Sequence, residues 1–115
     1  MGAYLHTIRV NFNHVFDDAT HRFIDSIDYQ PAVLWVQPGD GVRWISNYNL
    51  KVCFQKGTPF GHVQIQTDAE VPSAPETVLP NAAKRGYSYH THGALKILEV
   101  LLFYGDPGCP ELIVE

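Results

Sequence analysis

Several short runs of the chain alternate apolar and polar residues, which is the pattern of β-strands with one buried face. In residues 7–12 the apolar positions are Ile8, Val10 and Phe12, and the polar residues lie between them. The same period of two recurs in residues 50–55, 62–66 and 86–92. Short strands that each bury one face predict an all-β protein built as a sandwich.

A tight turn separates two further apolar runs near the middle of the chain. Pro38 fixes φ at the first corner position of this turn, and Gly39 supplies a positive φ at the second. Residues 33–36 and 42–45, on either side of the turn, are therefore predicted to be consecutive strands of a hairpin. Residues 47–49, Asn-Tyr-Asn, predict a second turn, because Asn tolerates the left-handed backbone conformation.

Two longer segments lack a clear alternation. Residues 14–28 carry four aspartates among aromatic residues and are predicted to form a loop or a short edge element. We interpret the aspartates as solvated turn residues, because they lack the ligand spacing and closing glutamate of a calcium-binding loop. Residues 67–85 contain three prolines and no alternation, so they are predicted to be a connection that crosses between two sheets. A turn of helix is compatible with residues 81–84 within this connection.

The pattern is ambiguous between residues 94 and 104. The leucines at positions 95, 98, 101 and 102 fit a helix, whereas positions 98, 100 and 102 fit a strand. We favour a strand, because a sandwich needs further pairing partners for its sheets. The Asp-Pro-Gly turn at residues 106–108 would then lead into a last strand at residues 112–114.

Length and composition fit one globular domain. The 115 residues are 45% hydrophobic and 17% charged, so we expect residues 1–115 to form a single folded domain. The formal net charge is -4 and the basic residues are scattered, which argues against a nucleic-acid partner. No apolar run approaches the roughly 20 residues that span a bilayer, and no signal-peptide pattern begins the chain. We therefore expect no membrane partner and a cytoplasmic location, or export with the signal peptide already removed.

The residues quoted for the central turn also carry a family resemblance. The run Val-Gln-Pro-Gly-Asp-Gly-Val-Arg-Trp at residues 36–44 resembles the PGD-x-V-x-W segment of the cupredoxin-like family, the Greek-key sandwiches best known as blue-copper proteins. The ending, Asp106-Pro107 followed by Leu-Ile-Val-Glu at residues 112–115, resembles the last strand of copperless members. The resemblance covers residues 5–115 and implies a Greek-key antiparallel β-sandwich.

The resemblance does not extend to the copper ligands. A type 1 copper site needs two His, a Cys and a weak axial ligand that is often Met. The family's first His corresponds here to about Leu50, and Met1 is the sole methionine. The loop after the Tyr-x-Tyr strand offers Thr91 and His92 but no Cys. We therefore expect no type 1 copper site and no cofactor.

His90 and His92 are the best remaining candidates for metal ligands. Two residues apart on a strand, they would leave the same face with Cα atoms about 6.6 Å apart. Two ligands bind a metal ion weakly, and His62 would add a third only if its strand lies nearby. A metal-binding protein that uses these histidines is the alternative prediction, and a pair of exposed histidines is the simpler interpretation.

Catalysis has little support in the sequence. There is no Gly-x-Ser-x-Gly elbow and no phosphate-binding glycine loop. A nucleophilic pair of Cys53 and His62 would need a lowered thiol pKa, which a sequence does not reveal. Whether Cys53 and Cys109 form a disulfide stays open, and free thiols are expected without a secretion signal. We predict that the protein is not an enzyme.

The main prediction is a structural or protein-interaction module. Edge strands of a sandwich carry unpaired amide and carbonyl groups that proteins either protect or use for pairing. Residues 7–12 and 62–66 are the predicted edges, because Arg9 is the only charged residue in either run. We expect a protein partner or a homo-oligomer through a sheet edge or face. Aromatic residues at alternating strand positions are expected in the core; these are Trp35, Trp44, Tyr87 and Tyr89.

Overall fold

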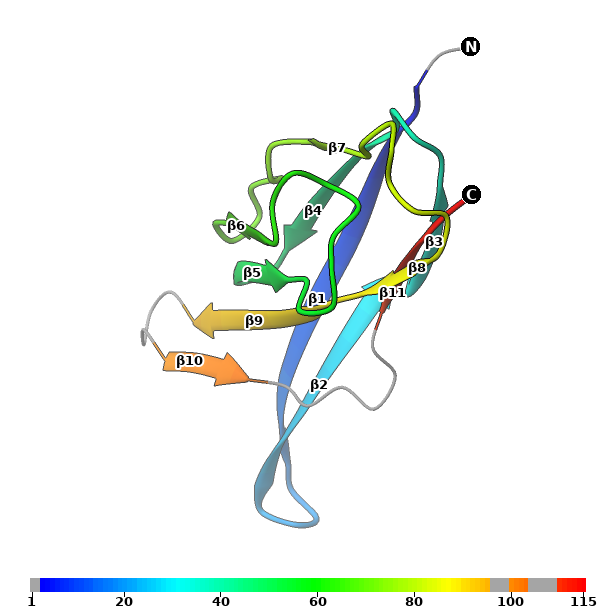
Figure 1. Cartoon of the computed structure of the whole chain (residues 1–115). Helices are drawn as coiled ribbons and strands as arrows, with labels where there is room; N and C mark the ends of the chain where they lie inside the picture. Colours follow the sequence, from blue (N-terminus) through cyan, green and yellow to red (C-terminus); the bar gives the residue numbers. More distant parts are fainter. Residues whose placement is uncertain (1–2, 96–99, 104–109) are drawn as a thin grey trace.

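The computed structural model describes residues 3–95, 100–103 and 110–115, and every regular element within these ranges is a β-strand (Figure 1). The strands form three sheets. The first has the order β2-β1-β4-β7, with β1 at Leu5–Asp17, β2 at Arg22–Gln30, β4 at Gly41–Ser46 and β7 at Glu76–Thr77. The second has the order β10-β9-β5-β6, with β10 at Val100–Phe103, β9 at His90–Leu95, β5 at Asn49–Cys53 and β6 at Gln64–Thr67. The third has the order β3-β11-β8, with β3 at Val33–Val36, β11 at Glu111–Val114 and β8 at Gly86–Ser88.

One apolar core joins the first sheet to the other two. Trp44, on β4, is fully buried, and its ring meets Phe54, Phe60 and Tyr89 edge to face at centroid distances of 5.8–6.3 Å. Residues from all three sheets contribute to this core, among them Ile8, Val10, Phe12, Val36, Val42, Leu50, Val52, Tyr87, Leu112 and Val114. The prediction of an all-β, sandwich-like protein is therefore confirmed.

The turn at Pro38 and Gly39 exists, but it does not join a hairpin. The Asp40 N–H donates to the Gln37 carbonyl at 3.0 Å, and Gly39 has a φ of 92°, as the sequence predicted. The strands on either side lie in different sheets, with β3 parallel to β11 and β4 parallel to β1. The predicted hairpin is wrong, and so is the expectation of purely antiparallel sheets, because the chain passes between layers at this corner.

Asp40 holds the corner against the N-terminal strand. Its side chain is nearly fully buried, and one carboxylate oxygen accepts the Tyr4 N–H at 3.1 Å. The other oxygen accepts the Gln37 N–H at 3.0 Å and lies 3.0 Å from His6 Nε2. Burial raises the pKa of Asp40, but the hydrogen bonds from His6 and from these two backbone groups outweigh burial and bring the pKa below its ordinary value. These contacts fix β4 beside β1, which explains why β4 does not fold back on β3.

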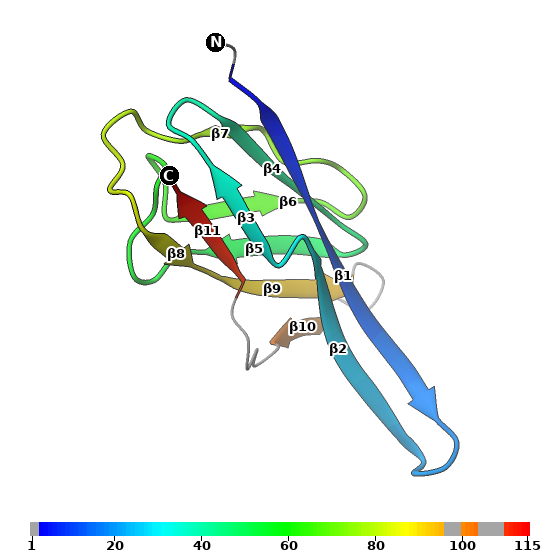
Figure 2. The ribbon, with the colours of Figure 1, turned by 90° about the vertical axis from the view of Figure 1, so that its right-hand side faces the viewer.

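Residues 14–28 form most of a long hairpin, so the predicted loop is wrong, and of the predicted short edge element only the edge is right, because the long strand β2 is the last of its sheet. β1 and β2 pair antiparallel from Arg9 opposite Gln30 to Asp17 opposite Arg22. The pairing of β1 with β4 ends much earlier along β1, at Val10. Figures 1 and 2 show the rest of the hairpin, here called the arm (residues 13–26), extending beyond the other strands. Among the described residues the arm pairs only its own two strands, which fits a sequence without a regular apolar face.

Asp17 closes the tip of the arm. Its carboxylate accepts the Ala19 N–H at 3.1 Å and the Thr20 hydroxyl at 2.8 Å. Next along the chain, His21 has a positive φ of 55°, which completes the reversal between β1 and β2. The interpretation of the aspartates as turn residues is therefore confirmed for Asp17 and Asp18 and wrong for Asp25 and Asp28, which lie in β2.

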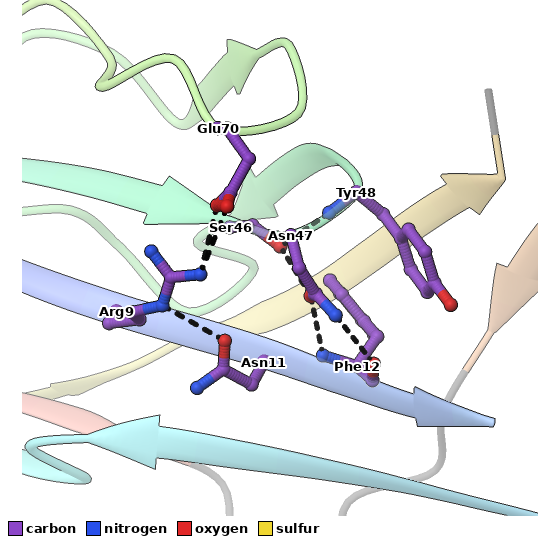
Figure 3. A network of polar contacts seen from close by, with 7 residues as sticks. All are labelled: Arg9, Asn11, Phe12, Ser46, Asn47, Tyr48 and Glu70. Atoms are coloured by element: carbon purple, nitrogen blue, oxygen red, sulfur yellow. Dashed lines mark hydrogen bonds and ion pairs between the residues drawn. The ribbon is translucent and has the colours of Figure 1, made fainter. Parts of the chain in front are cut away.

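Asn47 marks the point where the arm leaves the sheet (Figure 3). Its side-chain amide accepts the Phe12 N–H at 2.8 Å and donates to the Phe12 carbonyl at 2.8 Å. The side-chain amide of Asn47 thus makes the two hydrogen bonds with Phe12 that a further backbone residue of β4 would make. The backbone pairing of β1 with β4 ends just before it, at Val10 opposite Ser46. Ser46 and Glu70 support this position, because the Glu70 N–H donates to the Ser46 carbonyl at 2.7 Å and its carboxylate accepts from Arg9 at 2.9 Å.

The remaining segments follow the predictions with two changes. Residues 86–92 form two strands, β8 and β9, which meet at Tyr89, where the N–H donates to the Pro110 carbonyl at 3.2 Å. Residues 67–85 cross from β6 to β7 and then to β8 as predicted, and residues 79–82 form a hydrogen-bonded turn in place of a helical turn. In the ambiguous C-terminal segment, β9 and β10 pair antiparallel, which confirms a strand for its described part. Residues 96–99 and 104 lie outside the described residues.

Candidate interaction surface

Trp35 lies on the outer face of β3 and is 57% exposed, so the expectation that it is a core residue is wrong. Val33, two residues earlier on the same face, is 47% exposed. Val36 is buried and Leu34 is partly buried, so they form the inner face of the strand. The three other aromatic residues that were expected in the core behave differently from Trp35, because Trp44, Tyr87 and Tyr89 are all buried.

The apolar surface continues onto the neighbouring strand. Ile113 pairs with Trp35 across β3 and β11 and is half-buried, whereas Glu111 pairs with Val33 at the margin. We call Val33, Trp35 and Ile113 the β3 surface. Residues 31–39 contain no Lys, Arg, Asp or Glu, so β3 itself carries none of the charges that commonly protect an edge strand.

β3 is also an edge of its sheet. The order β3-β11-β8 leaves one side of β3 without a strand neighbour in the described part of the chain. An edge strand presents backbone N–H and C=O groups that another strand can pair with. The β3 surface therefore combines exposed apolar side chains with an unpaired backbone edge, and Figure 2 shows β3 and β11 on the side of the molecule that faces the viewer.

Of the two predicted edge strands, one is an edge and the other is not. β6, which contains most of residues 62–66, is the last strand of its sheet. Residues 7–12 lie in β1, which has β2 on one side and β4 on the other. A polar outer face with few charges shows that one face of a strand meets water. It does not show whether the strand has neighbours on both sides, because the long-range path of the chain decides that.

The candidate metal ligands are only partly brought together. His90 and His92 share the outer face of β9, where they lie opposite Cys53 and Lys51 of β5. The side chain of His62 contacts Glu76 instead, with Nδ1 2.7 Å from Oε1. Within residues 3–95, 100–103 and 110–115, no group of three or more His, Cys, Asp or Glu side chains is placed to hold a metal ion.

The electrostatics around His92 also oppose a bound cation. Burial is the largest cause that lowers the pKa of His92, and the positive charges of Lys51 and His90 lower it further. A lysine directly opposite His92 would repel a metal ion placed there. The geometry therefore gives no support to the metal-binding alternative.

The other candidate groups are accounted for individually. Cys53 is a free, half-buried thiol, and Cys109 lies outside the described residues. Leu50 is 3% exposed and belongs to the core. Thr91 is buried, with its hydroxyl 2.7 Å from that of Tyr29. The described residues also contain no helix long and apolar enough to cross a membrane.

Comparisons with known proteins give no information about the β3 surface. A scan against protein-family models found no match, and neither did a search of curated proteins. The sequence nevertheless contains one feature that indicates this surface, and a search for alternating residues does not detect it. Residues 33–36 are apolar at every position, so any strand formed there must present apolar side chains on both faces.

Proposed function

We propose that this protein is a non-catalytic, cupredoxin-like Greek-key module without a type 1 copper site, which associates with a protein partner or a second copy through the β3 surface. The observation that carries the proposal is Trp35, 57% exposed beside Val33 on an uncharged edge strand. Tryptophan is among the residues most enriched at the energetic centres of protein interfaces. An exposed apolar strand edge is also a surface that proteins either cover or use.

Two features support the cupredoxin-like part of the proposal. The Pro-Gly-Asp-Gly turn carries the chain from one sheet to another, and Trp44 of the same motif is at the centre of the core. A connection that moves between layers in this way is the kind that Greek-key sandwiches use. The absence of copper chemistry is supported by the residues at the matching positions, where Leu50 is a core side chain.

The β3 surface suits strand addition better than it suits a small ligand. A partner strand beside β3 would pair with its free backbone edge while its side chains pack on Val33 and Trp35. Complete burial of an exposed aliphatic or aromatic side chain contributes about 1.5–3 kcal/mol before the costs of association. Association itself costs about 4–15 kcal/mol, so the proposal requires backbone pairing along β3 in addition to burial of these two side chains.

Surface substitutions on β3 test the proposal. Light scattering over a concentration series would measure self-association, and immobilised protein would be used to retain partners from the native host. Trp35→Ser and Val33→Ser should each weaken the association seen with the wild type. Val63→Ser is the matched control, because Val63 is 58% exposed in the segment before β6, away from the third sheet. A wild-type protein that stays monomeric and retains no partner, or association that both β3 variants leave unchanged, would refute the proposal.

A further inference from the structure

A polar pocket of about 590 Å³ opens on the second sheet, separate from the β3 surface. Its lining comes from β5, the end of β6, the segment at residues 71–74, and β9. The polar side chains that matter for its chemistry are those of Asn49, Lys51, Gln66, Asp68 and His92. None of them belongs to the proposed protein-binding surface.

Three of these side chains form one row across three strands. Lys51 pairs with Gln66 of β6 on one side and with His92 of β9 on the other. Neighbouring strands are about 4.8 Å apart, so one small molecule can reach all three side chains. The ammonium group, the side-chain amide and the imidazole ring each supply N–H donors. Lys51 and Gln66 make no side-chain hydrogen bond or ion pair within the part of the chain that the structure describes.

Asn49 adds a donor to the same pocket. Its side-chain oxygen already accepts the Ala69 N–H at 2.9 Å, so the NH₂ group is the part of the amide left for a ligand. Asn49 and Lys51 are two residues apart on β5, which places them on the same face of the strand. Asp68 is the single acidic residue of the lining, and Lys51 balances its charge. The lining therefore places N–H donors of four side chains beside a single carboxylate.

We propose that this pocket binds a small oxyanion, a carboxylate or a phosphate, through Lys51, Gln66, His92 and the Asn49 amide. Charge-assisted hydrogen bonds from a lysine and neighbouring N–H donors are the interactions that oxyanions make in proteins. A cation is unsuited to the row because Lys51 stands at its centre. The positive charge of Lys51, which pairs with His92 across β5 and β9, favours a negative ligand at the same place.

Nuclear magnetic resonance titration of the untagged protein tests the proposal. Inorganic phosphate and citrate are added separately at constant ionic strength, with sodium chloride as the reference. Saturable shifts are expected at the amides of residues 49–51 and 66–68 and at the His92 ring, with little change elsewhere. Saturation by phosphate alone would assign a phosphate ligand, saturation by citrate alone a carboxylate, and saturation by both a general oxyanion site.

Substitutions in the lining test whether the anion binds in this pocket. Lys51→Gln should weaken binding about tenfold or more, since it removes a charged donor, and Gln66→Glu should abolish it by adding a negative charge. Lys56→Gln is the matched control, because Lys56 is exposed and outside the lining. Shifts that chloride reproduces, that do not saturate, or that persist at full size in Lys51→Gln would overturn the proposal. Because the β3 surface is separate, its substitutions should leave the titration unchanged.

Discussion

The two halves of β1 differ although they form one continuous strand. Residues 5–10 pair with β4 and residues 9–12 pair with β2, and Ile8, Val10 and Phe12 are at most 1% exposed. Residues 13–17 pair with β2 alone in the arm, and there Phe16 is 47% exposed although it continues the same face as Phe12. An apolar position in a strand is buried only if a second layer lies opposite it. Backbone pairing by itself does not bury a side chain.

The largest expected difference between the two halves concerns their phenylalanines. Phe12→Ala should lower the free energy of unfolding by about 3–5 kcal/mol, because it removes a buried aromatic ring and leaves a cavity. Phe16→Ala should cost less than about 1 kcal/mol, because Phe16 is 47% exposed and its removal uncovers less apolar surface. Urea denaturation of the two variants measures both values. Equal destabilisation would mean that the arm is as well packed as the sandwich.

A second contrast uses two aspartates, one at the corner and one in the arm. Asp40→Asn should lower the free energy of unfolding by about 1–3 kcal/mol, because a buried group that accepts from Tyr4, Gln37 and His6 is replaced by one that also carries donors. Asp18→Asn, at the exposed tip of the arm, should change it by less than about 0.5 kcal/mol. Chemical denaturation near neutral pH measures both variants.

The same aspartate gives a dependence of stability on pH. Folding lowers the pKa of Asp40, so its ionised form stabilises the protein at every pH above the unfolded-state pKa of about 4. This contribution is lost as the pH falls through the lower pKa of the folded state. Unfolding curves recorded from pH 6 to about pH 2 should therefore converge for the wild type and Asp40→Asn. Curves that stay parallel would show that Asp40 titrates alike in both states.

The boundary between the two halves of β1 depends on Asn47. Asn47→Ala should lower the free energy of unfolding by about 1–2 kcal/mol, because the Phe12 N–H and C=O lose their partners. Hydrogen exchange should also accelerate at the Phe12 amide. Asn13→Ala is the control inside the arm, where the lost bonds to Ser26 and Asp28 are exposed and the effect should be smaller. Unchanged exchange at Phe12 would show that Asn47 does not hold this boundary.

A last contrast compares two glycines with equal space around them. No heavy atom lies within 4 Å of the position a Cβ would take at Gly39 or at Gly61, and of the two only Gly39 has a positive φ, of 92°. Gly39→Val should therefore cost about 1–2 kcal/mol from backbone conformation alone. Gly61→Val should be close to neutral. Equal midpoints of thermal unfolding for the two variants would contradict the turn geometry at the corner.

Much of the local structure could be predicted from the sequence, and the arm shows where such prediction fails. The runs at residues 7–12, 50–55 and 86–92 were predicted as strands because one face of each is buried, which leaves a period of two in the sequence. The arm was missed because its sequence lacks that period, although its two strands pair over their whole length. Trp35 was misplaced for a related reason, since residues 33–36 are apolar on both faces and do not indicate which face meets water.

For the candidate sites, the sequence identified residue types but not their neighbours. His90 and His92 were correctly predicted to share a face, because that follows from their spacing on one strand. The positions of Lys51 and Gln66 beside His92, and of Glu76 beside His62, depend on which strands pair and in which register. Those pairings join residues up to about 40 positions apart, and local pattern carries no information about them.

The sequence by itself determined the all-β class, the positive φ of Gly39, and the inward faces of the strands that have a buried side, because each depends on backbone preferences and burial within a few residues. Only the tertiary structure decided which strands are neighbours. The turn at Pro38 and Gly39 fits a hairpin and a corner equally well, and the corner forms because the buried Asp40 carboxylate binds Tyr4 and His6 of the distant N-terminal segment. With the corner formed, β3 and β4 lie in different sheets, and Trp35 lies on an edge strand. The strand β1 continues as the arm beyond Phe12, where the Asn47 side chain binds it.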